Sequence, residues 1–465
     1  GLSGQSAARL LRALGHAVIL SDRNADVDLA ELKAIGCEDV RPREDVELLD
    51  AYSVGLVVTA PGVPLRNPIF QAARERNIPI RGENDFGFEV LRKLLRTNGA
   101  DPLFVGITGT DGKSTTTALL THLLNTAVSD CTAVACGNYG VPLSRLALDV
   151  HNGDTGARVY VVECSSFQLE AVHAFHPHVA ILLNVAADHL DRYDSFNDYL
   201  ATKVRIGANQ QPDDLFLVPH SLLARVESVG RELRSQGFAF QGRLRALQLE
   251  SLTNADDNPL YIQNQKIAER GDFSRPARHD FMNLMFALSA LEHLLQRGKL
   301  HWKPGDMRTA LAGFRGLPHR MEPAGRDDAR NIEFINDSKA TTVNAVLAAL
   351  QSFRGRRIHL LAGGRAKGTA FHDLAGHPNV WLYPFGEAAA EIQSATGTHD
   401  IYPDLKSAFE AAVKNAENQK ERGSSATLIL LSPGCASYDA FTSYTQRGDY
   451  FKELVSQWIH RSAHG

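Results

Sequence analysis

A glycine-rich turn near residue 110 has the residue types and spacing that could bind the phosphates of a nucleotide. It reads Gly109-Thr110-Asp111-Gly112-Lys113-Ser114, and Thr115 follows. Glycines allow backbone N–H groups to turn towards an anion, and the start of a helix adds a positive dipole end. In such a turn Lys113 can reach the β- and γ-phosphates, and the Ser114 hydroxyl can ligate Mg²⁺. The alternative is an ordinary glycine turn before a helix, since the commonest phosphate-loop pattern has a glycine where Ile107 stands.

Two strands that we expect beside this turn lead to residues that can bind a metal ion. The apolar run 159–163 ends at Glu163, and the run 179–183 leads to His189. A carboxylate at the C-terminal end of a strand suits a Mg²⁺ ligand, because open α/β sheets bind ligands at that edge. Either residue alone is more often structural, but both beside a Lys-Ser turn favour a metal site.

Polar clusters also follow four strands that we expect in the last third of the chain. They contain Asp337, Gly364, Gly386 and Ser437, after the apolar runs 332–335, 358–362, 380–384 and 426–431. Any one of them could be a helix cap, because Asp and Ser are good capping residues. Four polar strand ends in one domain indicate a ligand site instead.

Strands alternate with helices along the chain, which predicts an α/β protein with three domains around one cleft. We expect a Rossmann-like domain at 1–97, a P-loop ATPase-type domain at 98–316 and a second Rossmann-like domain at 317–465. Because the chain begins inside what looks like a glycine turn, we expect that the first strand of domain 1–97 is missing. That turn lacks the full G-x-G-x-x-G pattern, so a redox cofactor is only weakly indicated and a nucleotide-sugar ligand stays open.

The composition is that of an ordinary globular protein. With 465 residues the chain is too long for one core. A net charge of -4 gives no reason to expect a nucleic-acid or membrane partner. The five cysteines are scattered without a C-x-x-C pair, which fits a reducing cytoplasm and argues against a disulfide framework or a zinc site. No apolar run reaches the ~18 residues of a membrane span, and there is no signal segment, so we expect a cytoplasmic monomer.

Several motifs resemble those of the Mur ligases, the ATP-dependent amino-acid ligases of bacterial cell-wall synthesis. The resemblance covers nearly the whole chain, and its motifs are the phosphate turn and the runs 165–170, 188–192, 319–322, 336–341, 431–437 and 447–449. Within the family, the chain most resembles the members that add D-glutamate to UDP-N-acetylmuramoyl-L-alanine. The resemblance therefore implies ATP, two Mg²⁺ ions and these two substrates, with an acyl phosphate as the intermediate.

The resemblance also implies catalytic and nucleotide-binding roles. Lys113 would hold the ATP phosphates, Ser114 one Mg²⁺, and Glu163 and His189 a second Mg²⁺. Lys203, at the end of the predicted helix 196–203, matches a lysine that CO₂ carbamylates in this family. From its position alone Lys203 would be an ordinary surface lysine. The catalytic residues would thus be Lys113, His189 and Lys203, and the nucleotide would contact Gly109, Thr110, Asp111, Gly112, Lys113, Ser114, Thr115, Asn283, Arg320 and Asp337.

The two other substrates would contact further residues that match the family. Asn138 and Ser165 would lie near the UDP-sugar. D-Glutamate would be bound by lysines, hydroxyls and rings, namely Lys339, Thr341, Lys367, Ser437, Phe441 and Tyr444. Lysines and hydroxyl groups suit its two carboxylates.

Two residues depart from the family pattern, and two other readings stay open. Asp111 stands where Asn or a similar residue is usual, and Asp280 stands where Asn commonly follows the histidine, which would place an extra negative charge near the nucleotide. One alternative is a sister Mur ligase or a folylpolyglutamate synthetase with another amino-acid substrate. The other is a nucleotide-dependent binding protein without ligase chemistry, against which the metal residues argue.

Overall fold

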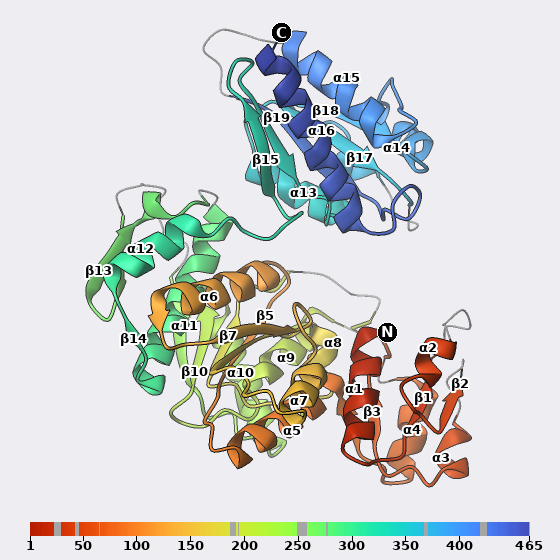
Figure 1. Cartoon of the computed structure of the whole chain (residues 1–465), viewed down its shortest axis with the longest axis vertical. Coiled ribbons are helices and arrows are strands. Elements are labelled where there is room, and N and C mark those ends of the chain that lie inside the picture. The colour runs from red at the N-terminus through yellow and green to blue at the C-terminus, as the bar shows by residue number, and fades with distance from the viewer. Residues whose placement is uncertain are drawn as a thin grey trace. The chain divides into compact units, whose positions relative to one another are not determined.

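In the computed structural model the chain forms two compact units, Gly1–Phe314 and Arg315–Gly465 (Figure 1). The structure describes residues 1–22, 29–41, 46–64, 66–186, 192–193, 195–248, 258–275, 278–366, 371–418 and 426–464. His189 and Lys367 lie outside these ranges. No helix in the described ranges is long and apolar enough to cross a membrane.

A six-stranded sheet forms the centre of the first unit. Its strand order is β11-β10-β9-β5-β8-β7, and every neighbouring pair is parallel. The strands are β5 (Leu103–Thr108), β7 (Ala133–Gly137), β8 (Val159–Glu163), β9 (Val179–Leu182), β10 (Leu215–Pro219) and β11 (Arg243–Leu247). The register pairs Glu163 with Ile107 on one side and with Gly137 on the other. Because parallel strands end at one edge, Glu163 lies beside the strand that leads into the phosphate turn.

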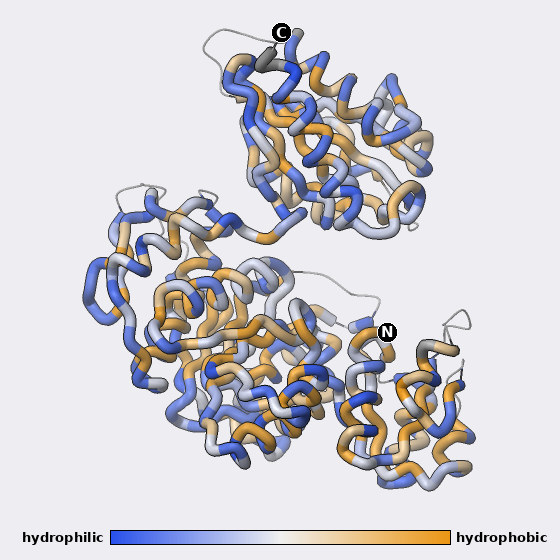
Figure 2. Tube along the Cα trace, in the orientation of Figure 1, coloured by the Kyte–Doolittle hydropathy of each residue, from blue (hydrophilic) through white to orange (hydrophobic). Residues whose placement is uncertain are grey.

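Helices cover both faces of this sheet (Figure 1). One core contains side chains of α6 (Lys113–Ala127), α11 (Arg278–Gly298) and α12 (Pro304–Gly313). The other contains side chains of α5 (Glu83–Thr97), α7 (Leu143–His151), α8 (Ser166–Leu169), α9 (Phe196–Val204) and α10 (Leu223–Ser235). Along β5, Val105 and Ile107 belong to the first core and Phe104 to the second, as the two-residue period of a strand requires. The strands are therefore apolar on both faces, and Figure 2 shows the central ones as hydrophobic segments.

The first 97 residues contain short strands in two separate pairs. β1 (Ile19–Ser21) pairs with β2 (Asp39–Arg41), and β3 (Val57–Thr59) pairs with β4 (Ile80–Gly82), both in parallel. The helices are α1 (Leu2–Ala13), α2 (Leu29–Lys33), α3 (Leu48–Ala51) and α4 (Pro68–Glu75). Helix α1 packs Leu10 into the core of the central sheet and Ala8 against the β1–β2 pair. We expected one Rossmann-like sheet here; in the described residues the two pairs are not hydrogen-bonded to each other.

The first unit also contains two small antiparallel pairs. They are β6 (Val128–Ser129) with β14 (His301–Trp302), and β12 (Pro259–Ile262) with β13 (Gln265–Glu269). Helices α10 and α12 were not predicted. Residues 279–283 belong to helix α11. This helix begins at Arg278, so these residues form its first turns.

The second unit contains a five-stranded sheet in the order β15-β16-β19-β17-β18. Its strands are β15 (Glu322–Asp327), β16 (Ile332–Asn336), β17 (Ile358–Gly363), β18 (Val380–Phe385) and β19 (Thr427–Gly434). Only β15, at the edge, is antiparallel to its neighbour among these strands. Helices α13 (Val343–Ser352) and α14 (Ala389–Thr396) pack on one face, and α15 (Leu405–Asn418) and α16 (Tyr444–His464) on the other. The predicted alternation of strands and helices is therefore present.

Candidate functional site

The phosphate turn joins β5 to α6, as predicted. Gly112 is the residue before the helix and has φ +81°, a conformation that an L side chain rarely adopts. A Cβ atom at this position would lie 2.5 Å from Oδ1 of Asn283. Asn283, from α11, is thus packed against the turn, and only glycine fits between it and the backbone.

The start of α6 leaves backbone donors open. In the described part of the chain, the N–H groups of Ser114 and Thr115 have no acceptor, whereas Thr116 N–H donates to the carbonyl oxygen of Gly112 at 2.9 Å. Unpaired N–H groups at a helix start, together with the helix dipole, attract an anion. The Ser114 and Thr115 side chains are buried beside these donors.

Asn184, just after β9, holds the turn in shape. Its Oδ1 accepts hydrogen bonds from the N–H groups of Thr110 (3.1 Å) and Asp111 (2.9 Å), and its Nδ2 donates to the Asp111 carbonyl oxygen at 3.1 Å. The Asp111 side chain is exposed. Asp111 therefore takes part in these hydrogen bonds through its backbone, not through its carboxylate.

Two lysines meet on one carbonyl oxygen of the turn. Lys113 Nζ donates to Gly109 O at 2.9 Å and to Thr110 O at 2.7 Å. Lys203 Nζ, from α9, donates to the same Gly109 oxygen at 2.8 Å. Lys203 is 1% exposed, and its ammonium group lies 4.3 Å from the ring centroid of Tyr199. The expectation of an ordinary surface lysine from position alone is therefore wrong, because α9 packs this side chain beneath the turn.

Glu163 has the chemistry of a metal ligand. Its Oε1 accepts a hydrogen bond from Asn138 Nδ2 at 2.7 Å, whereas its Oε2 is buried without a partner in the described residues. A buried carboxylate oxygen without a partner is costly, so a cation at this oxygen fits. His189, the second expected ligand, lies outside the described residues, which hold no group of three or more His, Cys, Asp or Glu side chains suited to a metal.

Ser165 and Asp280 have local partners. Ser165 caps α8, where its Oγ accepts from Gln168 N–H at 3.2 Å, while its own N–H donates to Gln168 Oε1 at 2.9 Å. Asp280 is buried, and its Oδ2 accepts from Arg275 Nε at 2.9 Å. The extra negative charge that we expected near the nucleotide is thus compensated by a buried arginine.

In the second unit, Asp337 occupies the end of β16. Its Oδ2 accepts from Ser432 Oγ at 2.9 Å and its Oδ1 from Met321 N–H at 3.2 Å. Burial raises the pKa of Asp337 to about 7, against the smaller opposing effects of these hydrogen bonds and of the nearby Arg320 charge. Asp337 is therefore an acid whose proton can be held or released near neutral pH.

Arg447 connects the ends of three strands at the same edge. Its guanidinium donates to Ser338 Oγ (3.0 Å), after β16, and to the carbonyl oxygens of Cys435 (3.1 Å), after β19, and Gly363 (3.4 Å), at the end of β17. The side chain is fully buried, and burial lowers its pKa to about 10. Arg447 thus fixes the geometry of the loops that carry the remaining candidates.

The candidates that the structure describes lie on loops near Arg447, except Tyr444, which is the first residue of α16. Lys339 and Thr341 follow β16, and Lys339 Nζ lies 5.4 Å from the ring centroid of Tyr444. Ser437 is buried after β19, and its carbonyl oxygen accepts from Phe441 N–H at 2.9 Å. All these residues belong to the C-terminal edge of one sheet, as expected from the polar strand ends.

Comparison with known proteins relates both units to one family. The Mur ligase middle domain matches residues 107–291, and the Mur ligase glutamate ligase domain matches residues 319–435. The UDP-N-acetylmuramoylalanine–D-glutamate ligase of Anaeromyxobacter dehalogenans is 36% identical, over 98% of this chain and 96% of its own. The chain belongs to the Mur ligase family. A relative of the same name from Bacillus cereus is 33% identical over the same shares of the two chains.

Solved structures agree with this Mur ligase fold. MurF from Acinetobacter baumannii superimposes with a TM-score of 0.56 at 14% identity, over 98% of each chain. MurF from Thermotoga maritima, solved with ADP, gives 0.55 at 14% identity, over 89% of this chain and 97% of that one. The apo form of L. casei FPGS superimposes with a TM-score of 0.50 at 14% identity, over 80% of this chain and 95% of that one. At such identities the likeness shows the shared fold, and the choice among amino-acid substrates depends on sequence.

Sequence reasoning assigned no role to several residues that this Mur ligase site contains. Asn184 hydrogen-bonds to the phosphate turn, and the ring of Tyr199 lies against the Lys203 ammonium group. Arg447 hydrogen-bonds to the loops at the strand ends of the second sheet. Asn184 could have been found, because it is a polar residue directly after a buried strand at the edge where ligands bind. Tyr199 and Arg447 lie within helices, where nothing in the sequence marks their partners.

Proposed function

We propose that this chain is an ATP-dependent ligase that adds D-glutamate to UDP-N-acetylmuramoyl-L-alanine in peptidoglycan precursor synthesis. The observation that carries the proposal is the 31–36% identity, over nearly the full length, to several ligases of that name. The position of Lys113 on the phosphate turn supports it, because a lysine ammonium there suits a triphosphate substrate. We further propose three α/β domains at 1–97, 98–316 and 317–465, the first and last Rossmann-like, with ATP in the middle one.

In the proposed reaction, the L-alanyl carboxylate of the UDP-sugar attacks the γ-phosphorus of ATP. The bond between this phosphorus and the β–γ bridging oxygen breaks, which gives an acyl phosphate and ADP. The turn 109–115 would cradle the phosphates, with the open N–H groups of Ser114 and Thr115 as donors. The Lys113 ammonium is already oriented by Gly109 O and Thr110 O, so it would meet the phosphoryl charge with little reorganisation.

The residues present fit Mg²⁺. We assign one ion to Ser114 and a second to Glu163 and His189. Glu163 Oε2, which is buried without a partner among the described residues, is the atom that favours a cation. Bound Mg²⁺ would neutralise charge on the transferring phosphoryl group. Asn138 would orient Glu163 through its hydrogen bond to Oε1, and Asn138 and Ser165 would contact the UDP-sugar.

Lys203 is proposed to be carbamylated by CO₂. In that reaction the neutral amine attacks the carbon of CO₂ and loses a proton, leaving a carbamate anion. The carbamate nitrogen keeps one N–H, so it can still donate to Gly109 O while its oxygens supply negative charge near the metal region. The modification would turn a buried cation into an anionic support for Mg²⁺.

The second step would be attack of the D-glutamate amine on the acyl carbon, which expels phosphate and, after loss of a proton, leaves an amide. We assign D-glutamate to Lys339, Thr341, Lys367, Ser437, Phe441 and Tyr444, whose lysines and hydroxyls suit two carboxylates. Arg320, Asp337 and Asn283 are assigned to the nucleotide. Arg447 is assigned a positioning role, because it contacts the loops that carry these residues.

The test is phosphate release from ATP with each combination of substrates and a panel of D- and L-amino acids. We expect release only when UDP-N-acetylmuramoyl-L-alanine and D-glutamate are both present, and none with Lys113→Ala. Release without an amino acid, or with another amino acid only, would reject the proposed function. Near-normal turnover of Lys113→Ala would reject the role of the turn.

A further inference from the structure

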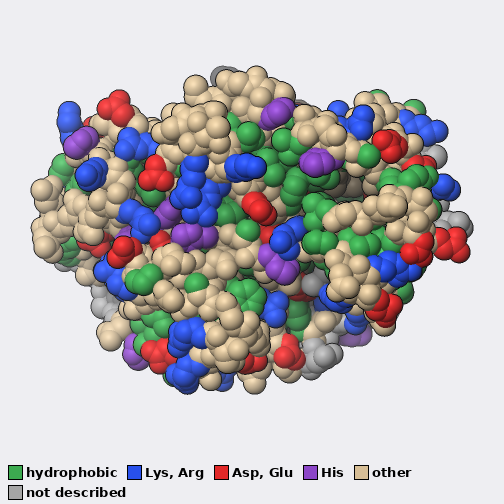
Figure 3. All heavy atoms as spheres, turned by 90° about the horizontal axis from the view of Figure 1, so that it is seen from below, with side chains coloured by type: hydrophobic (Ala, Val, Ile, Leu, Met, Phe, Trp, Pro, Cys, Tyr) green, Lys and Arg blue, Asp and Glu red, His purple; other side chains and the backbone are tan. Residues whose placement is uncertain are grey.

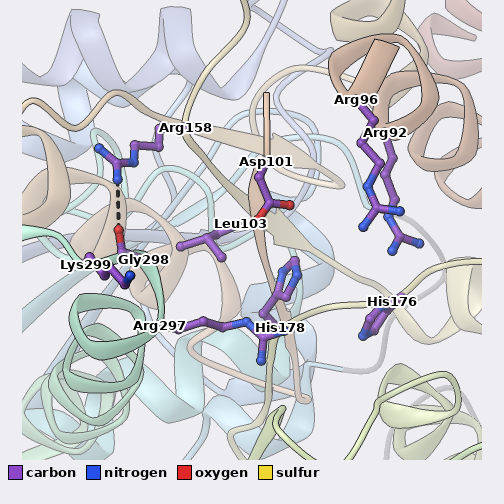
Figure 4. Close-up of a pocket in the computed structure, with 10 residues that line it drawn as sticks. All are labelled: Arg92, Arg96, Asp101, Leu103, Arg158, His176, His178, Arg297, Gly298 and Lys299. Atoms are coloured by element: carbon purple, nitrogen blue, oxygen red, sulfur yellow. Dashed lines mark hydrogen bonds between the residues drawn. The ribbon is translucent and has the colours of Figure 1, made fainter. Parts of the chain in front are cut away.

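A basic cavity lies at the opposite edge of the central sheet from the phosphate turn. Its volume is about 360 Å³, within the range of about 300–1,000 Å³ typical of small-molecule pockets. It is lined by Arg92, Arg96, Asp101, Leu103, Arg158, His176, His178, Arg297, Gly298 and Lys299 (Figure 4). Five of these side chains are cationic and one is a carboxylate. Lys, Arg and His side chains also gather in several places on the face of the molecule shown in Figure 3.

The cavity lies at the N-terminal ends of three strands of the central sheet. Leu103 begins β5, Arg158 directly precedes β8 and His178 directly precedes β9. The C-terminal ends of these strands lead to the phosphate turn, to Glu163 and to Asn184. A strand of five or six residues spans about 16–20 Å, so a molecule in this cavity is distinct from one on the turn.

Two guanidinium groups at the cavity have no polar partner within the part of the chain that the structure describes. In the described ranges, Arg92 and Arg96 make no hydrogen bond or ion pair, and Arg92 has only the ring of Phe88 at 5.7 Å. They stand four residues apart on α5, so they face the same side and repel each other. Burial and the Arg96 charge lower the pKa of Arg92. The fold thus holds together charges that would be stabilised by an anion.

Part of this positive charge lies at the C-terminal ends of α11 and α5. Arg158 Nη2 donates to Gly298 O at 2.8 Å, at the end of α11, and Arg297 pairs with Asp214 at 3.0 Å. Cations at helix C-termini are ordinarily favourable. Arg92 and Arg96 lie in the last turns of α5, but their guanidinium groups take no carbonyl partner there.

His178 adds a donor with a fixed direction. The N–H of Phe104 donates to His178 Nδ1 at 2.9 Å, so the neutral ring carries its proton on Nε2. Burial and the nearby Arg297 and His176 charges lower the pKa of His178 to about 3, which keeps the ring neutral at physiological pH. An N–H donor beside several guanidinium groups is suited to phosphoryl oxygens.

We propose that this cavity binds a small molecule carrying two or more phosphate groups, at a site separate from the phosphate turn. Arg92 and Arg96 would form paired hydrogen bonds with one phosphate group. Lys299 and Arg158, which line the cavity from other elements, would balance the charge of a second. In the described ranges four of the five cations, all but Arg297, have no carboxylate at ion-pair distance. The multiple charge of such a ligand matches these four better than a single carboxylate would.

The test is calorimetric titration of the full chain with inorganic tripolyphosphate, without Mg²⁺ and at about 0.1 M salt to screen exposed charges. We expect binding that persists in Lys113→Ala and is about tenfold or more weaker in Arg92→Ala/Arg96→Ala, because this variant loses charge-assisted hydrogen bonds to the phosphate group. The matched control is Arg225→Ala/Arg231→Ala, which removes two charges from the exposed side of α10 and should bind as the wild type. Lys299→Ala should also weaken binding. Because Lys299 is exposed, this variant tests the cavity even if the double variant fails to fold.

Binding that disappears in Lys113→Ala, or that weakens equally in the α10 control, would overturn the proposal, as would no binding at all. Flotation with vesicles containing phosphatidic acid separates the two sources of phosphate. Capture on vesicles without binding of tripolyphosphate would overturn the assignment to a soluble ligand.

Discussion

Lys203 Nζ donates a hydrogen bond to the carbonyl oxygen of Gly109 at 2.8 Å, and Lys113 Nζ donates to the same oxygen at 2.9 Å. A lysine of α9 and a lysine of α6 are therefore fixed on one atom of the phosphate turn. Lys203 is 1% exposed, so the cost of burying its charge must be offset by these local partners. This relationship joins the proposed modification site to the proposed ATP site.

Carbamylation of Lys203 predicts a spectroscopic signal. In protein equilibrated with ¹³C-labelled bicarbonate, we expect a carbamate ¹³C resonance that is absent in Lys203→Arg, because a guanidinium does not form a stable carbamate. Lys93→Arg, an exposed lysine of α5, is the matched control and should keep the signal. A wild-type spectrum without the resonance would contradict the modification.

Asn184→Ala should weaken the use of ATP. It removes three hydrogen bonds to the phosphate turn, so we expect kcat/KM for ATP to fall about 10- to 100-fold. Asn209→Ala is the control, because Asn209 makes two similar hydrogen bonds, to the carbonyl oxygens of His173 and Phe175, far along the chain from the turn. Equal effects of the two changes on kcat/KM would show that Asn184 has no special role.

Gly112→Ala should abolish ATP binding and lower the free energy of unfolding by about 1–3 kcal/mol. The added methyl group meets Asn283 Oδ1 at 2.5 Å, and the backbone has φ +81°. Asn283→Ala in the same chain relieves the contact but leaves the backbone strain, so we expect only partial recovery. Gly305→Ala, in α12 with open space around it, should be neutral or slightly stabilising, and calorimetric unfolding checks all four proteins.

Asp337 predicts a pH dependence of stability. Its pKa is about 7 in the folded chain and near 4 when unfolded, so the folded state binds more protons between these values. The stability contributed by Asp337 is present below about pH 4 and is lost as the pH rises to about 7. Relative to the wild type, Asp337→Asn should therefore gain up to about 4 kcal/mol between pH 4 and pH 8 in urea unfolding. The exposed Asp328→Asn is the control, and a pH-independent difference for Asp337→Asn would contradict the buried acid.

The sequence predicted the residues whose position depends on strand ends. Glu163, Asp337 and Ser437 follow apolar runs, and the apolar runs form the strands because both faces of each sheet are covered. Partners far apart in the sequence were not predictable. The sequence around Asn184 does not indicate that its side chain bonds to Thr110, 74 residues earlier. Near Asp280, Arg275 is the one residue that indicates how the negative charge is compensated.

Missed helices have a different cause. Helix α10 is polar over much of its length, with three buried residues, so its apolar stripe is short. Helix α12 begins with Pro304 at its first position, which is a usable start signal, but the apolar positions after it are few. In both cases packing against neighbouring elements decides the structure, α12 against α6 and β13 and α10 against α9.

The central claim is that ATP activates the substrate carboxylate as an acyl phosphate. Its most direct test uses UDP-N-acetylmuramoyl-L-alanine labelled with ¹⁸O in the terminal carboxylate, with ATP, Mg²⁺ and D-glutamate, and mass analysis of the released phosphate. Because the carboxylate oxygen that attacks the γ-phosphorus leaves with it, we predict one ¹⁸O atom in each phosphate formed. Unlabelled phosphate, formed at the same rate as the amide product, would contradict the account.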